Sequence, residues 1–149
     1  MAKPKTLKFG MLKIELGDGG SPEVFSAPCG LTQKAFNRTK NLTEVNVPDC
    51  DDPDAPTEVE RDITSTDWSI TGQGVLAGEA VATWDDAYAS ADSISIKITE
   101  VWPAPIGTIA YTGKAHLATY EVSSQSGGRA QVNISLQADG GLTRVPALA

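Results

Sequence analysis

Few residues of this sequence have the type and spacing that catalysis needs. The chain has a single histidine, His116, in a predicted strand between Ala115 and Leu117. A Ser-His-Asp or Cys-His system would have to use that histidine, and no G-x-S-x-G nucleophile turn occurs. Cys29 and Cys50 lie in or beside segments rich in proline and glycine, and we expect both to be reduced thiols. The sequence therefore predicts a protein that is not an enzyme.

The densest group of possible metal ligands is an acidic segment with four aspartates between Pro48 and Pro56. An EF-hand calcium loop that began at Asp49 would place Glu60 at its twelfth position, as such a loop requires. Its sixth position holds Asp54 where a glycine is needed, and no helical pattern flanks the segment. We therefore expect a solvated acidic loop, with no metal and no cofactor.

The elements that position these residues are mostly strands. Apolar and polar residues alternate along most of the chain, which is typical of strands with one buried face. Ala77, Val81, Trp84 and Tyr88 instead recur at helical spacing, which predicts one helix over Ala77–Ser90. We expect one domain over residues 1–149, an antiparallel β-sandwich or partly closed barrel with this helix packed on it. The predicted strands are 12–16, 23–26, 32–47, 63–76, 94–98, 107–122 and 132–136.

Two neighbouring segments do not fit into a core. Thr32–Val47 alternates weakly and carries polar residues on both faces, so it could form a long hairpin that projects from the body. Val47–Asp62 contains the stretch Pro48–Pro56, whose three prolines and four aspartates favour neither a strand nor a helix. The sequence thus predicts a long, projecting acidic loop over residues 47–62, and long loops in compact domains are usually functional or disordered.

Composition restricts the classes of function. The chain of 149 residues is 40% hydrophobic and 21% charged, which is enough for one core without disulfides or metals. Twelve Lys and Arg against 19 Asp and Glu give a net charge of −7, which argues against binding nucleic acid through its phosphates. No apolar run approaches the length of about 18 residues that a membrane span needs, and no secretory signal pattern is present.

The order of these elements resembles the major tail tube proteins of long-tailed bacteriophages. The resemblance rests on the strand Trp68-Ser69-Ile70-Thr71-Gly72-Gln73-Gly74-Val75-Leu76 and on the helix that follows it. It also rests on the last strand, Gln131–Gly140, where hydrophobic alternation ends in a glycine turn. The resemblance covers nearly the whole chain, although no single residue is diagnostic.

The resemblance implies a structural virion protein that forms hexameric rings. The rings stack into a tube, assembled in the host cytoplasm, through which the genome passes without sequence-specific binding. Other implied partners are the tape measure, tail terminator and tail tip proteins. The long loop of the family reaches a neighbouring subunit or ring, and the matching acidic residues here are Asp49, Asp51, Asp52, Asp54, Glu58 and Glu60. Thr32, Lys34 and Asn37 are the candidates for a strand with one face toward the lumen and the other against its own body.

One alternative is a monomeric β-sandwich that binds a ligand, such as an adhesin-like or carbohydrate-binding module. Such a module needs an exposed aromatic platform, for which Trp68 and Trp102 are the candidates. Trp68 alternates with Ile70, which favours burial of both side chains.

Overall fold

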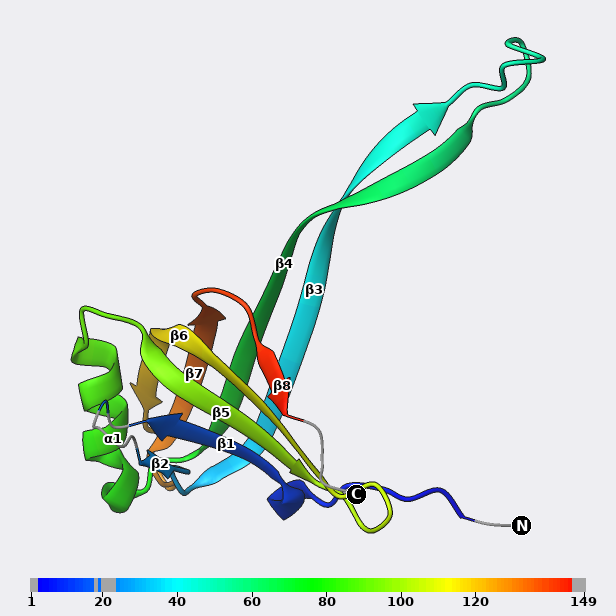
Figure 1. The fold of residues 1–149 in the computed structure, drawn as a ribbon. Coiled ribbons are helices and arrows are strands. Elements are labelled where there is room, and N and C mark those ends of the chain that lie inside the picture. The colour runs from blue at the N-terminus through cyan, green and yellow to red at the C-terminus, as the bar shows by residue number, and fades with distance from the viewer. Residues whose placement is uncertain (1–2, 18, 20–23, 146–149) are drawn as a thin grey trace.

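The computed structural model describes residues 3–17, 19 and 24–145 (Figure 1). Within them, eight strands form one antiparallel sheet with the order β2-β1-β5-β6-β7-β4-β3, and β8 pairs with β6. The elements are the 3-10 helix η1 (Phe9–Met11), β1 (Leu12–Gly17), β2 (Phe25–Ser26), β3 (Leu31–Val47), β4 (Glu58–Val75), α1 (Gly78–Ala89), β5 (Ile94–Val101), β6 (Thr108–Ser123), β7 (Gln131–Ala138) and β8 (Thr143–Val145).

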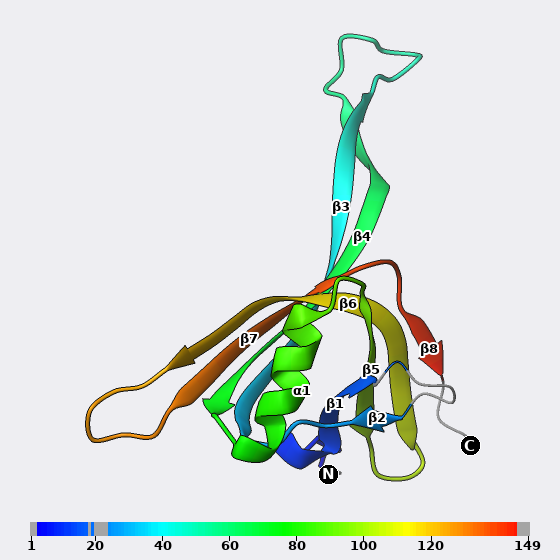
Figure 2. The ribbon, with the colours of Figure 1, turned by 90° about the vertical axis from the view of Figure 1, so that its left-hand side faces the viewer.

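The predicted fold class is confirmed, because a mainly antiparallel sheet curves into an incompletely closed layer with one helix packed on it (Figures 1 and 2). The two ends of the sheet approach each other at β1 and β3. There the Lys34 ammonium donates a hydrogen bond of 2.6 Å to the carbonyl of Leu12 and lies 4.2 Å from the centre of the Phe9 ring. Partial burial lowers the pKa of Lys34. At this place β1 and β3 are therefore linked by a side chain and not by backbone hydrogen bonds between paired strands.

The core forms where the alternating strands turn their apolar residues to one side. The largest fully buried side chains of its strands are those of Ile70, Ile96, Ile98, Val132 and Leu136. The only buried polar side chain among the described residues is that of Thr99. The alternation in the sequence therefore identified the core-facing positions of these strands correctly.

Helix α1 packs against β6, but with a different face from the one that its spacing predicts. Trp84 is buried as expected, and its buried neighbours are Ala80 and Ala87. Tyr88, which was predicted to share this face, is 58% exposed. The small alanine side chains allow the helix to lie close to the sheet, whereas a tyrosine at the interface would hold the two apart.

Gly74 is required where the beginning of β3 crosses the end of β4. A Cβ atom at this position would lie 2.2 Å from the carbonyl oxygen of Gly30 and 2.6 Å from the amide nitrogen of Thr32. Both contacts are with backbone, which cannot rotate away. Gly30 itself has φ +100°, a conformation that glycine adopts without strain.

The acidic segment is shorter than predicted, because β3 ends at Val47 and β4 already begins at Glu58. The prediction of a loop over Val47–Asp62 was therefore wrong at its C-terminal end. Residues 58–62 continue a ladder in which Val47 pairs with Glu58 and Thr43 with Asp62. Charged side chains are tolerated in this part of the strand because both of its faces meet solvent. Among the described residues, no helix is long and apolar enough to cross a membrane.

Candidate assembly surfaces

The most prominent surface is a two-stranded arm, which we define as residues 37–67. It leaves the body as a twisted ribbon with its loop, residues 48–57, at the tip (Figures 1 and 2). Every arm residue is exposed except Ala55, which is half-buried. The arm therefore buries almost nothing against its own subunit.

The root of the arm is fixed by aromatic packing. Phe36 contacts Trp68 edge-on, with ring centres 6.2 Å apart, and lies 5.7 Å from the ring of Tyr111. The Arg38 guanidinium stacks over the rings of Phe36 and Tyr111 at 5.2 and 4.9 Å. Trp68 Nε1 donates a hydrogen bond of 3.1 Å to the carbonyl of Gly140. These contacts set the direction in which the arm leaves the body.

The edges of the arm have no strand partner among the described residues. β4 pairs with β7 only from Ser69 to Val75, which leaves the edge of Glu58–Trp68 unpaired on that side. In the part of the chain that the structure describes, β3 has β4 as its only strand partner over its whole length. Unpaired N–H and C=O groups along such edges are ready to pair with another chain.

The two faces of the arm differ in character, because directly paired residues share a face. One face carries the Leu42–Ile63 pair, whose side chains are 50% and 56% exposed, and a Glu44–Arg61 ion pair of 3.3 Å. On the other face, three carboxylates of β4 stand opposite residues of β3. We call this the carboxylate face, and its cross-strand pairs are Val47–Glu58, Val45–Glu60 and Thr43–Asp62.

The predicted loop residues thus fall into two groups. Asp49, Asp51, Asp52 and Asp54 lie in the tip loop, where the Asp51 amide donates to Asp49 Oδ1 at 2.9 Å and the Ala55 amide to the Asp52 carbonyl at 3.0 Å. Glu58 and Glu60 lie instead in β4 on the carboxylate face. Asp62 joins them there, although the sequence interpretation did not single it out. The sequence feature that could have identified Asp62 is the spacing of acidic residues at every second position from Glu58 onward. In the described part of the chain, no three His, Cys, Asp or Glu side chains are grouped to hold a metal ion.

A second surface is the side of the sheet that faces away from the core. Three rows of paired residues cross β3, β4, β7 and β6, and their side chains form a polar surface that we call the polar face. His116 and Glu121 are its only titratable side chains. The rows are Asn37–Ser69–Gln137–His116, Ala35–Thr71–Ser135–Thr119 and Gln33–Gln73–Asn133–Glu121.

Hydrogen bonds link several side chains of the polar face. Gln73 donates to Gln33, and Gln137 Nε2 donates to Ser135 Oγ at 3.0 Å. The row between the second and third polar rows points to the opposite side and carries Lys34, Gly72, Ile134 and Tyr120. Burial, with a further contribution from the charge of Asp85, raises the pKa of Tyr120.

The three predicted lumen residues do not share one face. Asn37 lies on the polar face, whereas Lys34 is three residues away and points to the core side. Thr32 lies at a bulge, where its hydroxyl donates to the Gln73 carbonyl at 3.3 Å. The expectation that one side of Thr32–Val47 rests on its own body is wrong beyond residue 37, because both sides of the arm are exposed.

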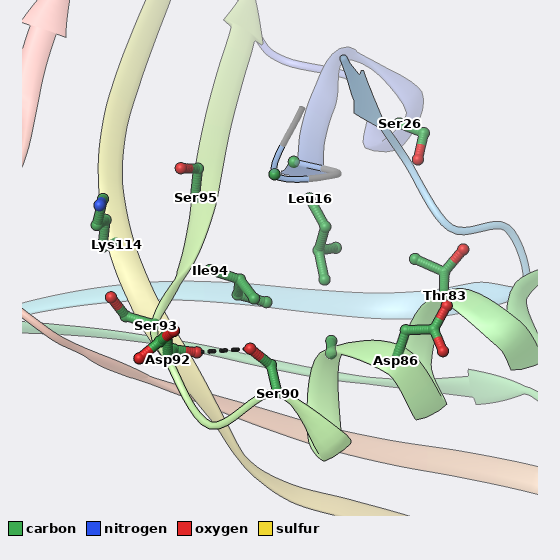
Figure 3. Close-up of a pocket in the computed structure, with 13 residues that line it drawn as sticks. Leu16, Ser26, Thr83, Asp86, Ser90, Asp92, Ser93, Ile94, Ser95 and Lys114 are labelled. Carbon is green, nitrogen blue, oxygen red and sulfur yellow. Dashed lines mark hydrogen bonds between the residues drawn. The ribbon is translucent and has the colours of Figure 1, made fainter. Parts of the chain in front are cut away.

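A cavity of about 600 Å³ opens between the C-terminal end of α1 and the beginning of β5 (Figure 3). Most of its labelled side chains are polar, with Lys114, Asp86 and Asp92 as the charged members, and Leu16 and Ile94 are apolar. Ser90 Oγ donates to the Asp92 carbonyl at 2.8 Å, so this serine is not paired with a base. The described residues that line the cavity include no histidine or cysteine.

The residues considered for other functions lie apart from one another. His116 lies 3.5 Å from a carboxylate oxygen of Asp139 at an exposed position. Cys29 and Cys50 are exposed and unpaired. Trp68 is only 4% exposed, and the half-buried Trp102 donates a hydrogen bond of 3.0 Å to Glu100. The two tryptophans therefore do not form the exposed platform that the binding-module alternative needs.

Comparisons with known proteins agree with this architecture. No curated protein sequence matches the chain. Among solved structures, the chain is similar to one from the tail of an empty gene transfer agent particle, determined with C6 symmetry, with a TM-score of 0.71 and 15% identity over 93% of this chain and 98% of that one. It is also similar to the SPP1 tail tube protein, with a TM-score of 0.62 and 18% identity over 97% and 81% of the two chains.

A chain from the tube-terminating cap of the anti-feeding prophage is similar as well, with a TM-score of 0.61 and 16% identity over 99% of this chain and 95% of that one. At these identities the structural likenesses show a shared fold. A family model described as phage tail tube protein matches residues 10–144. Because that match spans nearly the whole chain, the chain belongs to the phage tail tube protein family and has a structural, non-enzymatic role in a tail.

Proposed function

We propose that this chain assembles into hexameric rings that stack into a tail tube, and that the genome passes through the tube into the host. This proposal rests on the arm, which is an exposed two-stranded ribbon whose outer edges have no strand partner among the described residues. A monomer would gain little from ordering such a segment, because ordering costs roughly 1–2 kcal/mol per residue in backbone entropy. Contacts with neighbouring subunits offset that cost.

The arm, including its six predicted acidic residues, is the contact between subunits or rings. The similarity to a gene transfer agent tail with C6 symmetry supports rings of six. A chain with a similar fold forms part of a tube-terminating cap, which supports contacts with other tail proteins at the end of the tube. The partners at the ends and inside the tube are the tail terminator, tail tip and tape measure proteins, and the tube assembles in the host cytoplasm before it becomes part of the virion.

The polar face lines the lumen, with Asn37 among its residues and Thr32 at its margin. Its rows are built mainly from amides and hydroxyls, together with Ala35, His116 and one carboxylate at Glu121, and they hold no lysine or arginine. Such a wall offers no fixed cation to the phosphates, so it does not hold passing DNA. Lys34 does not contribute to this wall, because its ammonium is engaged on the core side.

Sedimentation of the purified chain over a range of concentrations tests the proposal. We expect rings and then tubes to appear as the concentration rises, and we expect a duplex DNA probe not to shift with the assembled protein. A species that stays monomeric up to millimolar concentration would overturn the proposed assembly. Tight DNA binding would overturn the assignment of the polar face to the lumen.

A further inference from the structure

Charge is divided between two ends of this molecule. Between Glu44 and Asp67, nine carboxylates stand against the single guanidinium of Arg61, a net charge of −8, although the whole chain carries only −7. The rest of the chain therefore has a net charge of +1. Residues 3–14 hold four lysines and no acid. In two views that differ by 90°, the arm tip and this N-terminal segment lie at opposite ends of the molecule (Figures 1 and 2).

The carboxylate face combines charge with apolar surface. Glu58, Glu60 and Asp62 occupy every second position of β4, so their side chains project to the same side. Val45 and Val47, directly across from two of them, are 42% and 38% exposed. A partner that complements this face must supply cations at short intervals together with apolar groups that cover the valines.

The segment before β1 has this composition. Lys3, Lys5 and Lys8 are exposed and closely spaced, and Lys13 follows near the beginning of β1. Apolar side chains stand among them, with Phe9 53% and Met11 42% exposed. The Lys5 ammonium donates to the carbonyl of Ala104, which ties the segment to the turn between β5 and β6. The segment therefore presents lysines and apolar groups from a position fixed on the body.

We propose that the carboxylate face of the arm docks onto the segment 3–13 of a second copy of this chain in the adjacent ring. This proposal rests on the proposed stacking of rings and names the surface that accepts the arm. The two surfaces lie at opposite ends of one subunit, so they meet only between subunits. A contact of this head-to-tail kind does not close on itself, and it repeats along the axis of an open tube.

Charge reversal on each side tests the pairing. One variant carries Glu58→Lys, Glu60→Lys and Asp62→Lys, and a second carries Lys3→Glu, Lys8→Glu and Lys13→Glu, with Lys5 kept because it contacts the body. A third variant combines all six changes. Every substituted side chain is exposed, so we expect each variant to melt near the parent temperature.

We expect either single-sided reversal to raise at least about tenfold the protein concentration at which tubes pellet, because like charges then meet across the interface. The six-fold variant should pellet near the parent concentration, since the attraction is restored with reversed signs. The matched control is Glu79→Lys with Asp85→Lys, two exposed acids of α1, which should leave pelleting unchanged. The same loss in this control would overturn the pairing, because overall charge would then explain the effect.

Parent tubes that survive either reversal, or a folded six-fold variant that fails to stack, would overturn the pairing while leaving the proposed function intact. A parent chain that forms no tubes would overturn both.

The dependence of tube length on salt concentration is a second measurement, and it needs no variant. Raising NaCl from about 0.1 M to about 1 M shortens the screening length from about 10 to 3 Å, and we expect tubes to separate into rings. Tubes of unchanged length at high salt would contradict the pairing.

Discussion

Removal of the arm separates its role in assembly from any role in stability. In the variant, residues 41–65 are replaced by Asn-Gly, which joins Lys40 to its cross-strand partner Thr66 through a two-residue hairpin turn. The arm is exposed along this length apart from half-buried Ala55, so almost no burial against the body is lost. Shortening the connection about twelvefold lowers the loop-closure cost of folding by about 2 kcal/mol. The free energy of unfolding should therefore stay constant or rise by up to that amount.

Calorimetry or circular dichroism measures the stability of this variant, and sedimentation measures its assembly. We expect a melting temperature between the parent value and about 8 °C above it, together with complete loss of tubes. The matched control is Trp68→Ala at the root of the arm, where a side chain that is 4% exposed is lost and the body should be destabilised by about 3–5 kcal/mol. A truncated chain that melts well below the parent, or that still forms tubes of normal length, would refute this reasoning.

Three further predictions concern the body and the tip loop. Gly74→Ala should destabilise the fold by about 1–3 kcal/mol in chemical denaturation, because the new Cβ meets backbone at 2.2 Å, whereas Gly78→Ala, with nothing within 4 Å, should be neutral or slightly stabilising. Trp84→Ala should cost about 3–5 kcal/mol, since this side chain is 1% exposed, and an unchanged denaturation midpoint would argue against a core role for α1. Melting in chelator and in millimolar calcium should coincide, whereas a large upward shift with calcium would identify a cation site at Asp49–Asp54.

The strands of the body could be predicted because burial differs between their two sides. Ile96 and Ile98 are fully buried, and their alternation with polar residues is a direct consequence. The beginning of β4 left no such signal. From Glu58 to Asp67 every residue is exposed, so neither face selects apolar side chains, and a sequence rich in acids next to prolines resembles a loop. Pairing with β3, which lies far away in the sequence, is what makes it a strand.

Only part of the candidate surfaces could be predicted, because some of their features depend on local sequence and others on the pairing of distant strands. The four aspartates of the tip lie in a loop, because proline and aspartate disfavour regular structure whatever surrounds them. The side to which Lys34 or Asn37 points depends instead on register, and a shift of one residue exchanges the two faces of a strand. The polar face likewise emerges only when β3, β4, β7 and β6 are placed side by side. No single segment of the sequence contains it.

Negative-stain electron microscopy of the purified chain at high concentration tests the central claim most directly. We predict tubes in side view and rings with six subunits in end-on class averages. In side view, the arms should bridge successive rings. A field of separate particles of monomer size, with no rings or tubes at any concentration, would contradict the account.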